Sequence, residues 1–332
     1  MPAEVRKPEP SGPAVELMLK FVVGQGATYK ITTEYQKSVE WKGSATARPA
    51  QFPDSRSGTH VELTFVQRVQ QVLEDGNAVL EITIKGLKYV GESVNKVVLD
   101  FDNARAEDAG NPLAKLVGKS YQVKMSPLGH VMEISGVVPL RQALQGPLPG
   151  NSVAQKLLTD EEIRNRHEIV ALAALKDCAV RPGQTWSNIK VLSFDDLGAK
   201  AYERVYALKQ AGRVGLAPPG PVGAEVGGAS PTLQPPTGSF QGRLAVVEMK
   251  AIPSAARAEE LYKRQKANPF ASMSDNTDNY EGRLVLDLDQ GQIREYVEQM
   301  QNEWIIFDPS SGQNPAAIRM AARRLHRLEQ VP

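Results

Sequence analysis

The chain has 332 residues, of which 41% are hydrophobic and 23% are charged, so it is long and apolar enough to form a packed core. Its 39 Lys and Arg residues against 38 Asp and Glu residues give a net charge of +1, which argues against a nucleic-acid-binding class. The single cysteine, Cys178, excludes an intramolecular disulfide and a zinc site built on several thiolates, and we interpret it as a small buried residue. No apolar run reaches the 18 residues needed to span a bilayer.

Residues 1–13 are rich in proline and have no apolar period, so we expect a disordered tail, with the first folded unit beginning at residue 14. From Tyr29 to Trp41 apolar and polar residues alternate, which predicts a strand with one apolar face. That face carries Tyr29, Ile31, Tyr35, Val39 and Trp41.

The segment from His60 to Lys88 predicts a long antiparallel hairpin, because apolar residues alternate on both sides of the turn Glu-Asp-Gly-Asn. Phe65 lies on its apolar parity. A strand over 94–101, a short helix begun by Asn111 and Pro112, and a tight hairpin around Ser126 to Gly129 complete a first β unit over 14–136.

A helical connector is predicted over 137–178. Thr159 and Glu162 form the capping box that begins a helix running to Asp177, and this helix is the candidate cover for one face of the sheet. His167 lies on the apolar stripe of that helix, so we interpret it as a core or edge histidine.

A second β unit is predicted over 179–332, with strands over 185–194, 202–214 and 240–252 and a last hairpin over 280–307. Residues 215–238 hold six prolines and six glycines, which predicts a disordered insert at a hairpin loop. A helix is predicted over 254–266 and a loop over 273–279. Residues 315–330 have apolar residues at helical spacing, so we expect a basic amphipathic helix that presents Arg319, Arg323, Arg324 and Arg327 outward, to solvent or to an anionic surface.

The pattern Gly-x-(Thr/Ser)-(Tyr/Trp) opens a strand three times, at Gly26, Gly118 and Gly183. After the first and the last of these, the chain runs through a strand, a hairpin and a tight glycine hairpin. We therefore predict a mainly β (α+β) fold made of two related antiparallel units joined by the helical connector.

Sequence motifs for nucleotide, zinc, calcium or serine-hydrolase chemistry are absent. Three acidic pairs, Asp100 with Asp102, Asp195 with Asp196 and Asp287 with Asp289, lie at predicted strand ends or turns. Such carboxylates can bind a hard cation or transfer protons, but solvation of a turn is the plainer interpretation. We assign no catalytic residue, no metal ligand and no cofactor.

The segments VGQGATYKITTEY, EDGNAVLEITI, NPLAKLVGKSYQVKMSPLGHVMEISG, RPGQTWS and YEGRLVLDLDQGQIREYVEQ together resemble a family of bacterial proteins catalogued as a domain of unknown function. Its members are usually exported or lipid-anchored, so the resemblance implies a β-rich protein of the cell envelope or periplasm if an export signal has been removed. If Met1 is the native start, we expect a cytoplasmic protein.

The leading hypothesis is a non-enzymatic envelope protein that serves as a scaffold or binds an apolar, lipid-like molecule. Its candidate ligand-facing residues are Tyr29, Ile31, Tyr35, Val39, Trp41 and Phe65. One alternative is a hydrolase-like or metal-dependent enzyme that uses the acidic residues at turns. Another is a module that binds a partner protein through an exposed sheet edge or apolar patch.

Overall fold

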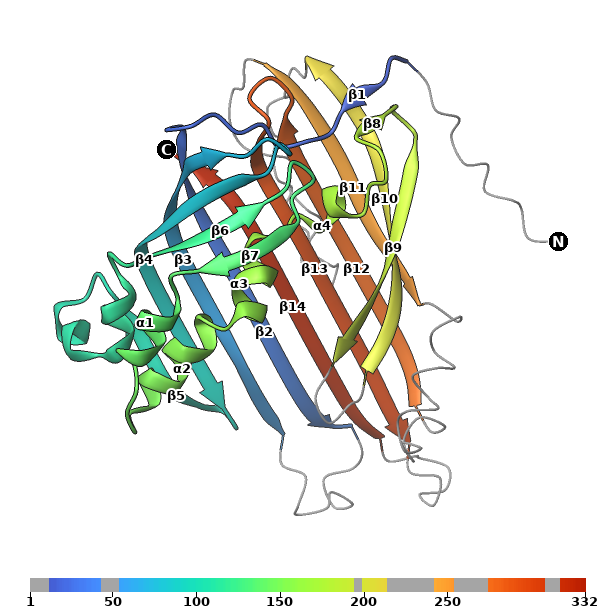
Figure 1. The fold of residues 1–332 in the computed structure, drawn as a ribbon. Coiled ribbons are helices and arrows are strands. Elements are labelled where there is room, and N and C mark those ends of the chain that lie inside the picture. The colour runs from blue at the N-terminus through green and yellow to red at the C-terminus, as the bar shows by residue number, and fades with distance from the viewer. Residues whose placement is uncertain (1–11, 43–53, 194–198, 214–241, 254–273, 308–316) are drawn as a thin grey trace.

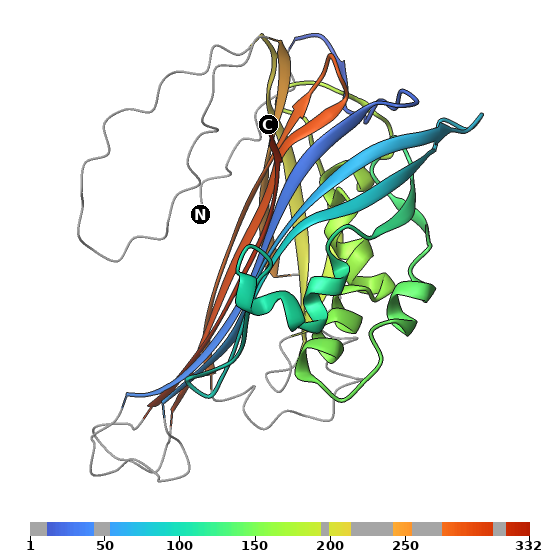
Figure 2. The same cartoon turned by 90° about the vertical axis from the view of Figure 1, so that its left-hand side faces the viewer.

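A computed structural model of the chain describes residues 12–42, 54–193, 199–213, 242–253, 274–307 and 317–332. One large, twisted antiparallel sheet forms most of the molecule, and short helices lie against one of its faces (Figures 1 and 2). The predicted mainly β fold class is confirmed. We call the face that carries the helices the inner face and the opposite one the outer face.

Within the described residues, twelve strands make up the large sheet. In chain order they are β2 (Gly26–Trp41), β3 (Ser55–Val72), β4 (Ala78–Ser93), β5 (Lys96–Asp102), β6 (Ser120–Met125), β7 (Val131–Ser135), β9 (Thr185–Ser193), β10 (Ala199–Arg213), β11 (Arg243–Pro253), β12 (Ser274–Asp287), β13 (Gln292–Phe307) and β14 (Ala317–Val331). A separate two-stranded sheet pairs β1 (Val15–Glu16) with β8 (Ala179–Val180).

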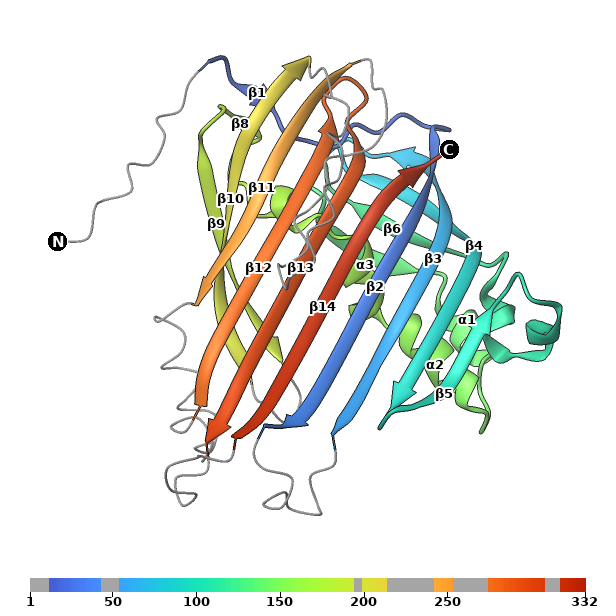
Figure 3. The same ribbon diagram turned by 180° about the vertical axis from the view of Figure 1, so that it is seen from behind.

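The strand order is β7-β6-β4-β3-β2-β14-β13-β12-β11-β10-β9, and β5 pairs with β4 outside this path. In each of two successions, β2-β3-β4-β6-β7 and β9-β10-β11-β12-β13, strands that follow one another in this order are neighbours in the sheet. They share one continuous sheet, because β14 pairs with both β13 and β2 (Figure 3). Gly26 is the first residue of β2, while Gly118 and Gly183, both with positive φ, lie two residues before β6 and β9.

The predicted C-terminal amphipathic helix is wrong, since residues 317–331 form the strand β14. An extended chain turns successive side chains to opposite faces, so the four arginines do not share one exposed stripe. On the outer face, Arg319 pairs with Glu303 and Arg327 pairs with Glu295, both on the neighbouring strand β13. Arg324 lies on the inner face, with its guanidinium 5.1 Å from the ring centroid of Tyr35.

The helical connector consists of four short helices instead of one long cover. These are α1 (Val138–Gln142), α2 (Pro149–Leu157), α3 (Asp160–His167) and α4 (Val170–Ala173). The backbone N–H of Glu162 donates to the Thr159 hydroxyl at 3.3 Å, so the predicted start of α3 is confirmed. The prediction that this helix continues to Asp177 is wrong, because Glu168 is extended and the Ile169 N–H donates to the Gly129 carbonyl in the β6–β7 turn.

Two 3-10 helices, η2 (Ala106–Gly110) and η3 (Pro112–Leu116), follow β5. The Asn111 side chain accepts from the Leu113 N–H at 3.0 Å, as its predicted capping role requires. The predicted loop over 273–279 is wrong from Ser274 onward, because β12 begins there and pairs with β13. The predicted helix over 254–266 and the insert over 215–238 lie outside the described residues.

The core lies between the inner face and the helices. Leu63, Phe65, Leu80 and Ile82 from the central hairpin are at most 1% exposed. The glycine hairpin adds Tyr121 and Val123, and the connector adds Ile163, Ala171 and Leu172, all of them buried. None of the described helices is long and apolar enough to cross a membrane.

Candidate functional site

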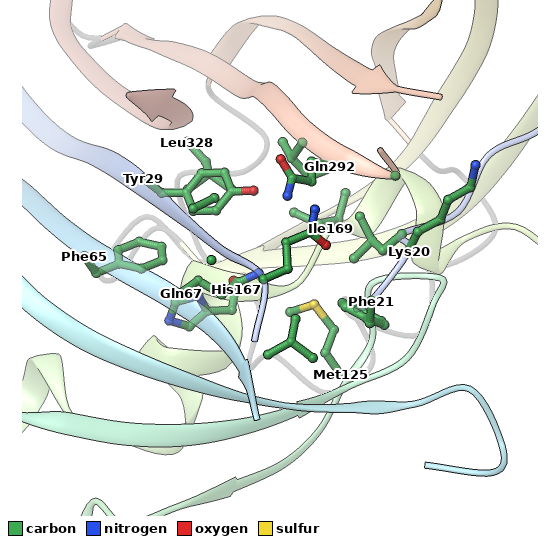
Figure 4. Close-up of a pocket in the computed structure, with 17 residues that line it drawn as sticks. Lys20, Phe21, Tyr29, Phe65, Gln67, Met125, His167, Ile169, Gln292 and Leu328 are labelled. Carbon is green, nitrogen blue, oxygen red and sulfur yellow. The ribbon is translucent and has the colours of Figure 1, made fainter. Parts of the chain in front are cut away.

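The inner face contains a small hollow in the part of the sheet that the helices cover closely. Its volume is about 40 Å³, and Tyr29, Phe65, Met125, His167 and Ile169 are among its lining residues (Figure 4). A water molecule needs about 10 to 15 Å³ of such space, so this hollow has room for a few waters and none for a lipid chain.

The six residues predicted to face a ligand fall into three groups. Tyr29, Ile31 and Phe65 are 4%, 2% and 1% exposed and belong to the packed core, where the rings of Tyr29 and Phe65 stack with centroids 5.8 Å apart. Tyr35 lines a much larger cavity, described below. Val39 lines a surface hollow toward the far end of β2, and Trp41 is half-buried at the end of that strand.

The large cavity has a volume of about 670 Å³ and lies between the sheet and the connector. Strands β9, β10, β12, β13, β14, β2 and β3 supply its floor, and α2, α3 and α4 supply the opposite side. Its side chains are mostly polar or aromatic: Tyr35, Asn165, Glu168, Asn188, Lys190, Tyr202, Arg204, Tyr280, Tyr296, Glu298, Met300, Arg324 and His326.

Two small residues help to explain why the floor is hollow. The strand register places Ala251 opposite Arg204 and Gly282 opposite Glu298, so each charged residue has a small neighbour on the adjoining strand over which its side chain can reach. A Cβ at Gly282 would lie 2.8 Å from Met249 Cε and 2.9 Å from the Val297 carbonyl oxygen, which makes glycine the residue that fits there.

An ion pair crosses this hollow. Arg204 Nη1 lies 3.2 Å from Glu298 Oε1, and the two side chains are 5% and 19% exposed. Arg204 Nε also donates to Asn188 Oδ1 at 3.2 Å, and the Tyr296 hydroxyl donates to Glu298 Oε1 at 2.5 Å. Burial alone would raise the pKa of Glu298, but Arg204 and the Tyr296 hydroxyl hold it below its usual value. Glu298 is therefore a carboxylate at neutral pH.

Other polar groups on the floor have shifted pKa values. The Tyr280 hydroxyl is buried beside the Glu298 carboxylate, and burial, followed by that carboxylate, raises its pKa. Burial, followed by the charge of Arg204, lowers the pKa of Lys190. Burial also lowers the pKa of His326 to about 4, so this imidazole is neutral at pH 7.

The predicted acidic pairs serve turns where the structure describes them. Asp287 is 1% exposed, accepts from the N–H groups of Asp289 and Gln290 at 2.9 Å, and lies 2.6 Å from Arg294 Nη2. Asp289 pairs with Arg243 at 2.7 Å.

The pair at the end of β5 is similarly engaged. Asp100 lies 2.9 Å from Arg105, and Asp102 lies 3.2 Å from Lys88. Asp195 and Asp196 lie outside the described residues. Within the described ranges, no group of three His, Cys, Asp or Glu side chains could hold a metal ion.

His167 is 3% exposed, so its predicted place in the core is confirmed. Its Nε2 lies 2.7 Å from the Tyr121 hydroxyl, which also accepts from Arg166 at 3.1 Å, and burial lowers its pKa well below the usual value. Cys178 is only half-buried.

Sequence reasoning missed the residues that form the cavity floor. The available signal is a charged residue on an otherwise apolar or aromatic parity: Arg204 stands between Tyr202 and Tyr206, and Glu298 stands between Tyr296 and Met300. A charge at such a position points to a polar site on a half-buried face.

Comparison with known proteins adds little. No family model matches this chain, and no curated protein matches it. A solved structure that it matches is that of DynF from the dynemicin biosynthesis pathway of Micromonospora chersina, at 8% identity, covering 95% of this chain and 85% of that chain with a TM-score of 0.16. A TM-score this low does not indicate a shared fold.

Proposed function

We propose that this protein is a non-enzymatic binding protein that holds a small amphiphilic organic molecule in the 670 Å³ cavity of its inner face. The cavity itself carries the proposal. Small-molecule sites are concave, enclose about 300 to 1,000 Å³, and combine apolar or aromatic walls with a few fixed polar groups. Here Tyr202, Tyr280 and Met300 supply walls, and the pair formed by Arg204 and Glu298 supplies fixed charge.

The packed end of the inner face argues for an amphiphilic ligand instead of a purely apolar one. The apolar surface of Tyr29, Ile31 and Phe65 is covered by the protein's own side chains, and only about 40 Å³ stays empty beside it. A purely apolar ligand would have to desolvate the charged floor of the larger cavity without replacing its hydrogen bonds, which is costly. A ligand with both a polar group and an apolar part fits that lining better.

Titration with the neutral, environment-sensitive dye Nile red tests the proposal. We expect saturable binding by the wild-type protein, and loss of that binding in Thr33→Trp, which places an indole in the cavity. Thr32→Trp is the matched control, because the adjacent side chain points to the outer face. Absence of saturable binding, or equal binding by the two folded variants, would contradict the proposal.

The resemblance to exported bacterial proteins supports placing this binding activity in the cell envelope. Fractionation of the native host with an antibody against the protein tests the location. Recovery with the cytosol alone would contradict it.

A further inference from the structure

The charges that face the large cavity are unevenly distributed between its two sides. The sheet floor carries Lys190, Arg204 and Arg324 against Glu298, while the other carboxylate on the sheet side, Glu34, pairs with His60. Glu298 lies in direct contact with Arg204, so its negative charge neutralises the charge of the Arg204 guanidinium before that of the other two residues. The floor therefore keeps an excess of positive charge at neutral pH, when His326 is neutral.

The groups on the helical side do not contact Lys190. Glu162 and Lys156 carry opposite charges there, and Glu168 lies 3.9 Å from His130 Nδ1. Among the described residues, Lys190 forms no hydrogen bond through its side chain and no ion pair within 4.0 Å. Its side chain is half-buried on β9, and the carboxylates of Glu298 and Glu168 act on it only at longer range, so its ammonium group has no direct partner in place of water.

Lys190 also lies beside an aromatic wall. In the register of β9 and β10 it is directly opposite Tyr202, and alternation places both side chains on the inner face. Tyr202 in turn packs with Met300 and Trp304 in a small buried cluster. A ligand that places an anion on Lys190 can therefore lay its apolar part along Tyr202 and Met300.

We propose that the molecule bound in this cavity is an anionic amphiphile whose carboxylate or phosphate pairs with Lys190. This inference rests on the proposed binding function and adds the charge of the ligand and the residue that recognises it. The anion supplies the missing partner of the ammonium group, and Arg324 on the same floor adds longer-range attraction. Electrostatic recognition of this kind weakens as salt concentration rises.

Competition with Nile red distinguishes the charge of the ligand from the existence of the site. The competitors are decanoate, decyl phosphate and the neutral decanol, all below micelle formation, together with acetate and inorganic phosphate. For the wild-type protein we expect the two anionic amphiphiles to bind at least about tenfold more tightly than decanol, because loss of a partner from a buried charge pair costs this much or more.

Variants of Lys190 test whether this side chain causes the preference for anionic amphiphiles over decanol. Lys190→Gln should bring decanoate to the affinity of decanol, and Lys190→Arg should keep most of the preference. Lys250→Gln is the matched control, since it removes one positive charge from an exposed outer-face position on β11. It should behave as the wild type does.

The outcomes separate the two proposals. If decanol competes as well as decanoate, or if Lys190→Gln keeps the preference, the anion inference is wrong while the binding function stands. If inorganic phosphate competes as well as decyl phosphate, the site recognises a free anion, and the proposal that its ligand is an amphiphile is wrong. If neither Nile red nor any amphiphile binds, both proposals fail.

Discussion

Truncation of Phe65 to alanine measures how tightly the inner face is packed against the connector. The Phe65 side chain is 1% exposed, stacks on Tyr29, and meets the ring of His167 edge-on with centroids 5.0 Å apart. A buried Phe→Ala change costs about 3 to 5 kcal/mol, from lost transfer free energy and the cavity left behind. Each aromatic contact adds roughly 0.5 to 1.5 kcal/mol.

The hollow beside Phe65 narrows the expected loss of stability to the upper part of this range. Phe65 lines the 40 Å³ space beside His167, so the void left by its ring would join an existing gap instead of being filled by neighbours. Because the cost rises with the cavity that remains, we expect Phe65→Ala near the upper end of that range, about 4 to 5 kcal/mol.

Urea denaturation followed by tryptophan fluorescence gives the free energies, and Val66→Ala is the matched control. Val66 is only partly buried and points to the outer face, so its truncation should cost about 1 kcal/mol. Similar losses for the two variants, with unchanged denaturant slopes, would show that both faces of β3 are equally packed and would refute the reasoning.

Three further predictions concern a buried base, a turn and the insert. Burial and, to a smaller extent, the positive charges of Lys190 and Arg166 lower the pKa of His326 from 6.5 to about 4, so the folded state binds this proton more weakly than the unfolded state. The neutral His326 side chain thus contributes fully to the free energy of unfolding above pH 6.5, and this contribution is lost as the pH falls toward 4. The wild-type protein should therefore lose more stability between pH 7 and pH 5 than His326→Gln does, by at most about 2 kcal/mol in urea titrations. Asp287→Ala should lower the free energy of unfolding by about 3 kcal/mol, because it removes the acceptor of two turn N–H groups and the partner of an arginine, while Asp287→Asn should cost less; equal losses would contradict this account. Replacing residues 215–238 with a four-residue turn should leave the melting temperature within a few degrees, because the flanking strands are already paired, and loss of soluble protein would contradict this prediction.

Local patterns predicted most strands because most of them follow one simple rule. The alternation from Tyr29 to Trp41 lies within β2, and the hairpin from His60 to Lys88 lies within β3 and β4. In each of these strands, every second side chain faces the apolar side of the sheet and the side chains between them do not. Alternation of apolar and polar residues predicts a strand under this condition.

β14 breaks that rule, which is why its sequence predicts a helix. Its inner-face positions include Arg324 and His326, which line a polar cavity, while its outer-face positions include Leu325 and arginines that pair with neighbouring strands. The inner face of β14 is thus apolar at Met320, Ala322 and Leu328 but polar at Arg324 and His326 between them, so the strand alternation is interrupted in the middle. The apolar residues Ile318, Ala321, Ala322, Leu325 and Leu328 fall by coincidence at helical spacing.

The cavity could not be predicted from the same patterns. It depends on which strands become neighbours, since Arg204 and Glu298 meet across β11 and β12, where the residues beside them, Ala251 and Gly282, are small. Arg204 and Glu298 are 94 residues apart in the sequence and are brought together by the pairing of the strands between them. A pattern within a short stretch of sequence therefore does not predict their contact.

The central place of β14 also constrains the order in which a ribosome-bound chain can complete this fold. β2 begins at Gly26, yet one of its two edges pairs with residues 318–331, so during translation that edge stays open until almost three hundred further residues have been made. The free edge of β13 waits for the same segment. Unpaired strand edges recruit other chains, so the nascent protein exposes the edge of β2 through most of its synthesis and that of β13 only near its end. A holding chaperone that covers the edge of β2 should therefore raise the folding yield.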